Sequence, residues 1–205
     1  MAGQIKSKER VAEHGEVFTA EREVNAMLDL VKQETERIDS RFLEPACGTG
    51  NFLVEILRRK LRLVHREQEM VQAVSSIYGI DIMQDNVEEC RERLLGVIVA
   101  NYGKLEGDVL QSVEYILSRN ILWGDALTLC TPDEEKRPIV FSEWGFVGEM
   151  VKRRDYTLDM LLRNQPMQEP NLFSDLGDDA FIPTPCAEYK LIHYLKLYTQ
   201  DATQQ

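Results

Sequence analysis

Apolar positions recur along the chain with two periods, which indicates alternating helices and strands. The first helix is predicted over residues 21–38, where the apolar side chains fall on one face, with Thr19 as its N-cap. A short apolar run over 40–45 predicts a buried strand, and residues 48–70 predict a turn followed by one long amphipathic helix. Strand, turn and helix thus begin the main folded unit.

The same order repeats further along the chain. A second strand is predicted over 75–83, a helix over 84–103, another helix over 109–120, a third strand over 120–127 and, after a charged loop over 131–138, a fourth strand over 139–144. Strands that alternate with helices are typical of a parallel α/β sheet. We expect all four strands to join one such sheet.

Beyond about residue 150 the pattern weakens. Residues 155–164 predict a helix, 165–186 are loop-like and rich in proline and acids, and 188–200 are amphipathic without a clear period. The acidic stretch 168–181 is interpreted as a loop or a partner-docking strip. The expected parts are an N-terminal helical segment over 1–40, an α/β core over 41–150 and a poorly defined extension over 151–205.

Composition and charge narrow the class of protein. A chain of 205 residues with 43% hydrophobic content can bury one substantial core. The net charge of −11 argues against a broad phosphate-binding surface. The densest basic run, Lys152-Arg153-Arg154, is interpreted as a solvated turn, and a phosphate contact is the alternative.

Cysteine and histidine usage bear on location and on metals. The four cysteines stand far apart without a CxxC pair, which is typical of reduced thiols in the cytoplasm. The N-terminus is too polar for a signal peptide, and no apolar run approaches the roughly 18 residues of a membrane span. The three histidines lack nearby metal-ligand partners. We expect a soluble cytoplasmic protein with no membrane association and no metal.

The stretch FLEPACGTGNFL, residues 42–53, holds the clearest candidate site. Gly48 and Gly50 let the backbone turn tightly and approach a ligand where the first strand ends. Asp81 ends the second strand and Asp125 the third, and ligands of α/β sheets bind beyond the carboxyl ends of the strands. The alternative is a plain turn, with acids that cap the next helix. GxGxxG and GxxxxGK[ST] are absent, which argues against a dinucleotide-oxidoreductase site and a phosphate loop.

These stretches together resemble the S-adenosylmethionine-dependent DNA adenine-N6 methyltransferases, in particular the modification subunits of restriction-modification systems. FLEPACGTGNFL is similar to their first motif, YGIDI (78–82) to the second and NILWGDAL (120–127) to the third, in the family's order. EHGEVFTAEREVNAML (13–28) is similar to the segment before the first motif. The resemblance covers roughly residues 10–145 and implies a Rossmann-like class I methyltransferase sheet, truncated, with an N-terminal helical segment.

The resemblance also implies that the core over 41–150 binds S-adenosylmethionine. The glycine turn would lie against the methionine part of this cofactor, with Phe18 and Thr19 at its methionine end, Asp81 on the ribose and Asp125 near the adenine. The implied cofactor-binding residues are Phe18, Thr19, Glu44, Pro45, Ala46, Cys47, Gly48, Gly50, Asn51, Phe52, Asp81, Ile82, Asp125 and Ala126.

The family's catalytic motif is missing. That motif is Asn or Asp, then Pro-Pro and an aromatic residue, at the end of the fourth strand, where Ser142, Glu143 and Trp144 stand here, with Phe146 just beyond. Glu143 could accept a hydrogen bond from an amine, and Trp144 or Phe146 could stack on a flipped base. The residue types favour the alternative, in which both rings pack against the core or a partner and Glu143 faces solvent.

Two functions follow from this comparison. The resemblance implies an N6-adenine DNA methyltransferase, or the modification subunit of one. The missing motif favours a catalytically inactive methyltransferase-fold module, a pseudoenzyme that senses cofactor, regulates, or acts as a restriction decoy. Because little of the chain follows the fourth strand, DNA specificity would come from a partner specificity subunit, in a hetero- or homo-oligomer.

Overall fold

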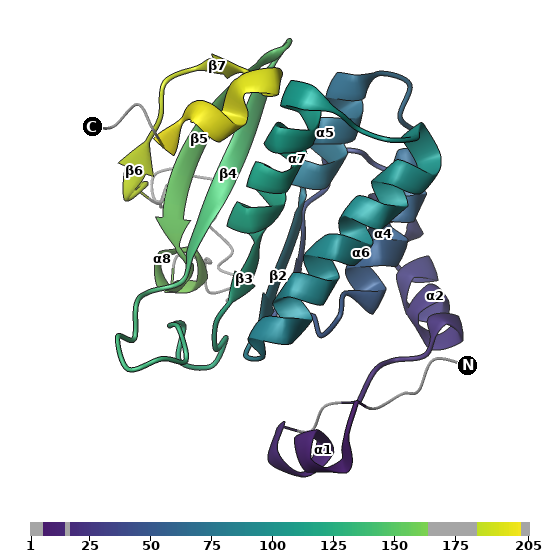
Figure 1. Ribbon diagram of the computed structural model, residues 1–205, viewed down its shortest axis with the longest axis vertical. Helices are drawn as coiled ribbons and strands as arrows, with labels where there is room; N and C mark the ends of the chain where they lie inside the picture. Colours follow the sequence, from purple (N-terminus) through teal and green to yellow (C-terminus); the bar gives the residue numbers. More distant parts are fainter. Residues whose placement is uncertain (1–5, 15–16, 164–183, 202–205) are drawn as a thin grey trace, which may run out of the picture.

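The computed structural model describes residues 6–14, 17–163 and 184–201 of a mixed α/β fold (Figure 1). Its helices are α1 (Lys8–His14), α2 (Glu21–Asp29), α3 (Lys32–Thr35), α4 (Asn51–Leu61), α5 (Glu67–Ser75), α6 (Gln84–Tyr102), α7 (Gly107–Asn120), α8 (Leu158–Arg163) and the 3-10 helix η1 (Tyr194–Thr199). Its strands are β1 (Phe42–Glu44), β2 (Ile77–Asp81), β3 (Ile121–Trp123), β4 (Val140–Val147), β5 (Met150–Thr157), β6 (Ala187–Glu188) and β7 (Ile192–His193). The acidic stretch 168–181 lies outside the described residues.

Three strands form a parallel sheet in the order β1-β2-β3. Helices α4 to α7 lie together along one side of this sheet (Figure 1), and their apolar faces supply most of the main core. Every residue of β2 is buried, as is typical of a parallel strand covered on both faces. The prediction of a parallel α/β sheet is therefore confirmed for its first three strands.

The fourth predicted strand does not join that sheet. Strand β4 pairs along its whole length with β5 in an antiparallel hairpin, and β6 and β7 pair with β5. A parallel neighbour needs a long crossover, usually a helix, whereas 124–139 contain no helix and the partner β5 follows after a two-residue turn with Gly148 at φ +59°. The hairpin also crosses residue 150, where the sequence placed the end of the core.

Four local predictions need correction. The helix predicted over 21–38 is two short helices, α2 and α3, and ends at Thr35. The single helix over 48–70 is two helices, α4 and α5, because the Glu69 carboxylate accepts from the backbone N–H groups of His65 and Arg66 and so begins a new helix. Thr19 is not the N-cap of α2; Ala20 holds that position, with no side-chain cap. The helix predicted over 155–164 begins only at Leu158, since residues up to Thr157 belong to β5.

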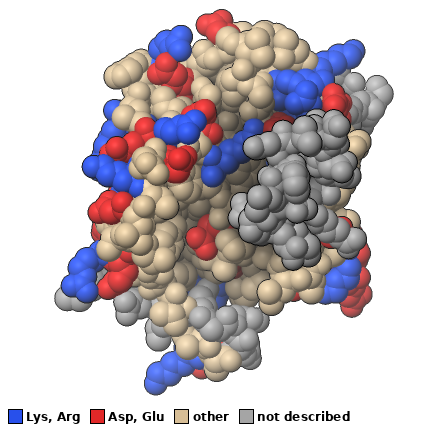
Figure 2. Space-filling model, turned by 180° about the vertical axis from the view of Figure 1, so that it is seen from behind, with Lys and Arg blue, Asp and Glu red and all other residues tan. Residues whose placement is uncertain are grey.

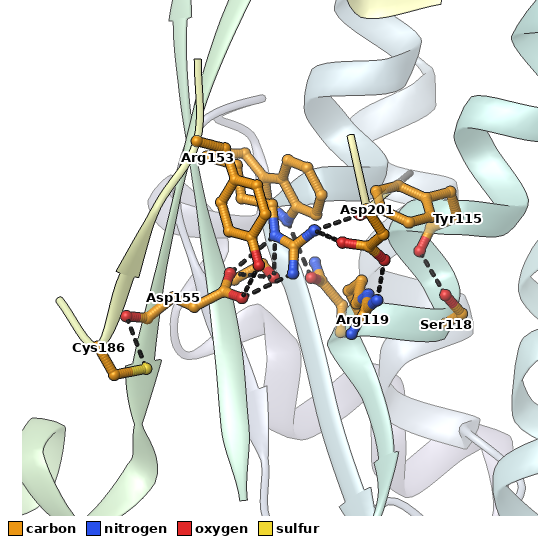
Figure 3. A network of polar contacts seen from close by, with 11 residues as sticks. Tyr115, Ser118, Arg119, Arg153, Asp155, Cys186 and Asp201 are labelled. Carbon is orange, nitrogen blue, oxygen red and sulfur yellow. Dashed lines mark hydrogen bonds and ion pairs between the residues drawn. The ribbon is translucent and has the colours of Figure 1, made fainter. Parts of the chain in front are cut away.

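The basic run Lys152-Arg153-Arg154 lies on β5 and is not a solvated turn. Alternation along the strand directs Arg153 inward, where it is 1% exposed, and its two neighbours outward. The Arg153 guanidinium lies between Asp155 (Nη2–Oδ2 2.6 Å) and Asp201 (Nη1–Oδ1 2.8 Å), as Figure 3 shows. It also stacks over the ring of Tyr189 at 4.0 Å. This ion-pair cluster joins the C-terminal segment to the hairpin.

Candidate functional site

A pocket of about 220 Å³ opens where β1 and β2 end. It lies between the glycine turn, the residues just after β2 and the extended segment before α2. Its lining consists of Val17, Phe18, Thr19, Glu44, Ala46, Cys47, Gly48, Asn51, Phe52, Asp81, Ile82, Met83 and Asn86. Most of the residues singled out in the sequence therefore surround one cavity, at the edge of the sheet where α/β proteins bind ligands.

Both glycines of the turn adopt backbone conformations that favour glycine, with φ +51° at Gly48 and +87° at Gly50. A Cβ on Gly48 would lie 3.1 Å from the Phe18 ring, so this glycine lets the turn and the N-terminal segment meet. A Cβ on Gly50 would lie 2.5 Å from the Cys90 sulfur, inside the core. Gly48 thus shapes the pocket, and Gly50 fits α4 against α6.

Asp81 organises the turn from beneath. Its Oδ2 accepts from the Gly48 N–H at 2.8 Å, and its Oδ1 accepts from the Met83 N–H at 2.9 Å and from the Asn86 amide at 3.1 Å. A carboxylate offers about four acceptor positions, and these donors occupy three of them. Asp81 is also only 8% exposed, so its main contribution is to hold the glycine turn in place.

Glu44 is the acid of the pocket whose charge no described Lys or Arg compensates, and the Ala46 backbone N–H donates to it. Its side chain is half-buried, and burial raises the pKa of its carboxyl above the ordinary value. Within the part of the chain that the structure describes, no Lys or Arg forms an ion pair with it. A ligand with a cationic or strongly donating group would find its natural acceptor here.

The N-terminal segment crosses the pocket and is held at both ends. On one side the Asn51 amide donates to the carbonyl of Thr19 at 2.9 Å, and Arg93 donates to the Asn51 side chain at 2.8 Å. On the other side Arg10 pairs with Asp85 at the start of α6 at 2.6 Å. The segment over 17–19 is thereby kept against the glycine turn.

Asp85→Asn is expected to loosen the N-terminal segment. The hydrogen bond from Arg10 lowers the pKa of Asp85 to about 2, so its contribution is complete above about pH 4 and is lost as the pH falls towards 2. Because this carboxylate is half exposed, we expect amide exchange over 8–14 at pH 7 to rise only about two- to fivefold. Glu106→Gln, which removes an exposed ion pair elsewhere, is the control. Unchanged exchange in Asp85→Asn would contradict this role.

Four residues of the sequence-derived set lie outside the pocket lining: Pro45, Gly50, Asp125 and Ala126. The Asp125 carboxylate accepts from the Leu127 N–H and the Thr128 hydroxyl, both at 2.9 Å, and so stabilises its own turn. Val17, Met83 and Asn86 line the pocket without having been singled out. The sequence position of Asn86 could have predicted its role. It stands five residues after Asp81, which ends the strand, and therefore in the first turn of the next helix, close to that acid.

The four residues near the missing catalytic motif do not line this pocket. Trp144 is buried, and its indole N–H donates to Asn120 at 2.9 Å. Phe146 packs against the main core, and the buried Ser142 hydroxyl donates to Asp155 at 2.8 Å. Glu143 is half-buried and pairs with Arg41 at 2.8 Å. Both rings therefore pack inside the fold, and Glu143 belongs to a different part of the surface.

The described residues contain no group of three or more His, Cys, Asp and Glu side chains arranged for a metal ion. All four cysteines are free thiols. A hydrogen bond with Cys90 and burial raise the pKa of Cys47 beside the pocket, which keeps it neutral. Among the described helices, none has the length and apolar character needed to cross a bilayer.

The site therefore consists of a backbone turn, an acid that holds it, an uncompensated acid and an aromatic ring. This combination suits a small polar ligand with a cationic group, held by backbone donors and one carboxylate. No protein-family model, no curated protein and no solved structure matches this chain, so the geometry of the pocket is what supports a functional proposal.

Proposed function

We propose that this protein is an S-adenosylmethionine-binding protein of the DNA adenine-N6 methyltransferase type, acting as a modification subunit. The observation that carries the proposal is the convergence of Phe18, Gly48 and Asp81, from three separate motifs, around one pocket at the carboxyl ends of parallel strands. The β1-β2-β3 order is compatible with a Rossmann-like class I sheet. Three of the four stretches named in the resemblance contribute lining residues to this pocket, whereas the third motif, over 120–127, contributes none, and the meeting of the first three supports the proposal.

The pocket fits one end of this cofactor better than the whole of it. Its volume of about 220 Å³ is below the roughly 300–1,000 Å³ of typical small-molecule sites. Glu44 would accept from the ammonium of the methionine part, the glycine turn would lie beside it, and Asp81 has one acceptor position left for a hydroxyl. When bound, the cofactor supplies an electrophilic methyl group on a sulfonium.

A catalytically inactive module with the same pocket is the second candidate. The placement of Ser142, Glu143 and Trp144 away from the pocket favours it, since a transfer motif must touch the reacting amine. Such a module would sense the cofactor, regulate a partner, or act as a decoy for a restriction system.

The charge distribution favours a DNA contact made through a partner subunit. On the described part of the face drawn in Figure 2, Lys and Arg side chains are interspersed with Asp and Glu rather than gathered into one basic area. Affinity for a duplex depends on neutralising several phosphates with basic side chains. A specificity subunit would therefore supply the phosphate contacts.

Calorimetric titration with S-adenosylmethionine tests the proposal, and Glu44→Gln is the informative variant. Glu44 pairs with no other charge in the described chain, so its substitution leaves the fold intact while removing the acceptor for the ammonium. We expect saturable binding that weakens about tenfold, the size of one lost charge-assisted hydrogen bond. Asp81→Ala is less informative, because it also releases the glycine turn.

Two further variants show whether the loss of affinity is specific to the pocket. Asp39→Asn changes an exposed acid outside the pocket and should leave the affinity unchanged. Asp125→Asn tests how far the ligand extends, because this acid lies outside the lining. No heat with millimolar cofactor would refute both candidate functions. If binding occurs, methyl transfer to adenine-containing DNA separates the enzyme from the inactive module.

A further inference from the structure

A second, larger pocket of about 480 Å³ lies on the opposite face of the parallel sheet. Gly79 of β2 faces Leu53 of α4, so the neighbouring Tyr78 faces away from the helices. There Tyr78 packs with Phe141 of β4 in a small apolar cluster separate from the main core. The second pocket is thus bounded by the parallel sheet on one side and by the β4–β5 hairpin on the other.

Three aromatic side chains line the second pocket: Tyr78, Phe141 and Tyr156. Tyr78 and Phe141 meet edge to face, with ring centroids 5.4 Å apart. The buried Tyr78 hydroxyl donates to the carbonyl of Ser142 at 2.9 Å, so this ring is fixed and its polar atom satisfied. Rigid aromatic walls of this kind suit a planar ring.

Donors at the rim converge on one carboxylate. Arg41 approaches Glu143 at 2.8 Å, whereas Arg154 lies 3.8 Å from it and the Tyr156 hydroxyl 3.4 Å. The last two distances exceed those of good hydrogen bonds, and Arg154 lies 3.5 Å from its other acidic neighbour, Glu188. Arg154 and Tyr156 therefore have donor capacity that Glu143 uses poorly.

The rim is also positive in an otherwise acidic chain. Among the residues that the structure describes, Arg41 and Arg154 of the lining face one carboxylate, Glu143, and the neighbouring Lys152 pairs with Glu188, which leaves one excess positive charge. The whole chain carries −11. An anionic group is therefore favoured at this rim, although most of the surface would repel it.

We propose that the second pocket binds a planar aromatic carboxylate. The ring of the ligand lies between the aromatic side chains of the pocket. Its carboxylate accepts from Arg154 and Tyr156, the two donors that Glu143 contacts only at long distance. Arginine suits this role because its planar fork of N–H groups matches a carboxylate. The proposal is independent of cofactor binding, since the two pockets share no lining residue.

The opposite occupant, a ring with an amino group, is disfavoured by the same contacts. An amine would need the Glu143 carboxylate as its acceptor, and an arginine already lies beside each of its oxygens, Arg41 at 2.8 Å and Arg154 at 3.8 Å. A cationic amine would also meet the excess positive charge of the rim. The charge of the ligand is therefore the property that a binding experiment should vary.

A matched pair of probes tests the proposal: 2-naphthoate and 2-naphthylmethylammonium, which share a ring system and differ in charge. We expect 2-naphthoate to bind saturably, at least about tenfold more tightly than the cation, by calorimetry. Arg154→Gln should weaken naphthoate binding about tenfold, because it removes a charge-assisted pair. Arg66→Gln, an exposed arginine outside the second pocket, should have no effect.

Glu143→Gln decides between the two charges. Removing this carboxylate frees Arg41 and Arg154, so naphthoate should bind several times more tightly. An amine-binding site would instead lose affinity for its cation. Equal binding of the two probes, preference for the cation, or weaker naphthoate binding in a normally folded Glu143→Gln would overturn the proposal. Unfolding curves for each variant separate loss of the site from loss of the fold.

Discussion

Arg153→Met is expected to lower the free energy of unfolding by about 3–5 kcal/mol, the usual cost of removing one partner from a buried ion pair. Within the part of the chain that the structure describes, the substitution leaves the carboxylate of Asp155, which is 6% exposed, with the hydroxyls of Ser142 and Tyr189 as its side-chain partners. It also removes the contact to Asp201 that holds the C-terminal segment against β5. Urea unfolding at pH 7 measures the loss.

Two comparisons show whether the lost charge is the cause. Arg154→Gln alters an exposed neighbour on the same strand and should change stability by less than about 0.5 kcal/mol. The double variant Arg153→Met with Asp155→Leu removes both buried charges and should be more stable than Arg153→Met alone. If the free energy of unfolding of Arg153→Met lies within about 1 kcal/mol of that of the unsubstituted protein, the ion-pair cluster does not stabilise the fold in this way.

Gly50→Ala is expected to destabilise the protein by about 2–5 kcal/mol, from two sources. An alanine at φ +87° carries a backbone cost of about 1–2 kcal/mol, and overpacking against the Cys90 sulfur at 2.5 Å adds about 1–3 kcal/mol. Gly96→Ala is the matched control, because nothing lies within 4 Å of its added Cβ in the middle of α6. That control should raise stability by roughly 0.5–1 kcal/mol.

A double-mutant cycle separates the two sources for Gly50. Cys90→Ala removes the sulfur that the new methyl group would strike, while the backbone cost at φ +87° stays. The double variant should therefore lose less stability than the sum of the two single variants. Strict additivity would mean that the contact with Cys90 contributes nothing and that the backbone conformation alone requires glycine.

Local pattern was sufficient for the three strands of the parallel sheet, because burial on both faces gives β2 a continuous apolar run. It was also sufficient for most of the candidate pocket, since parallel strands bring their carboxyl ends to one edge. Pattern missed the break between α4 and α5, although its cause is local. Glu69 accepts from the backbone N–H groups of His65 and Arg66, while a single amphipathic period spans both helices and hides the break.

The sequence by itself determined the parallel strands, the glycine turn and most of the residues around it, because side-chain periodicity and backbone freedom are local properties. Only the tertiary structure decided that β4 pairs with β5, since the apolar pattern of a strand does not specify which neighbouring strand it pairs with. It also decided that Arg153 is buried: its partner Asp201 lies 48 residues away, and no local pattern reports an ion pair formed across that separation.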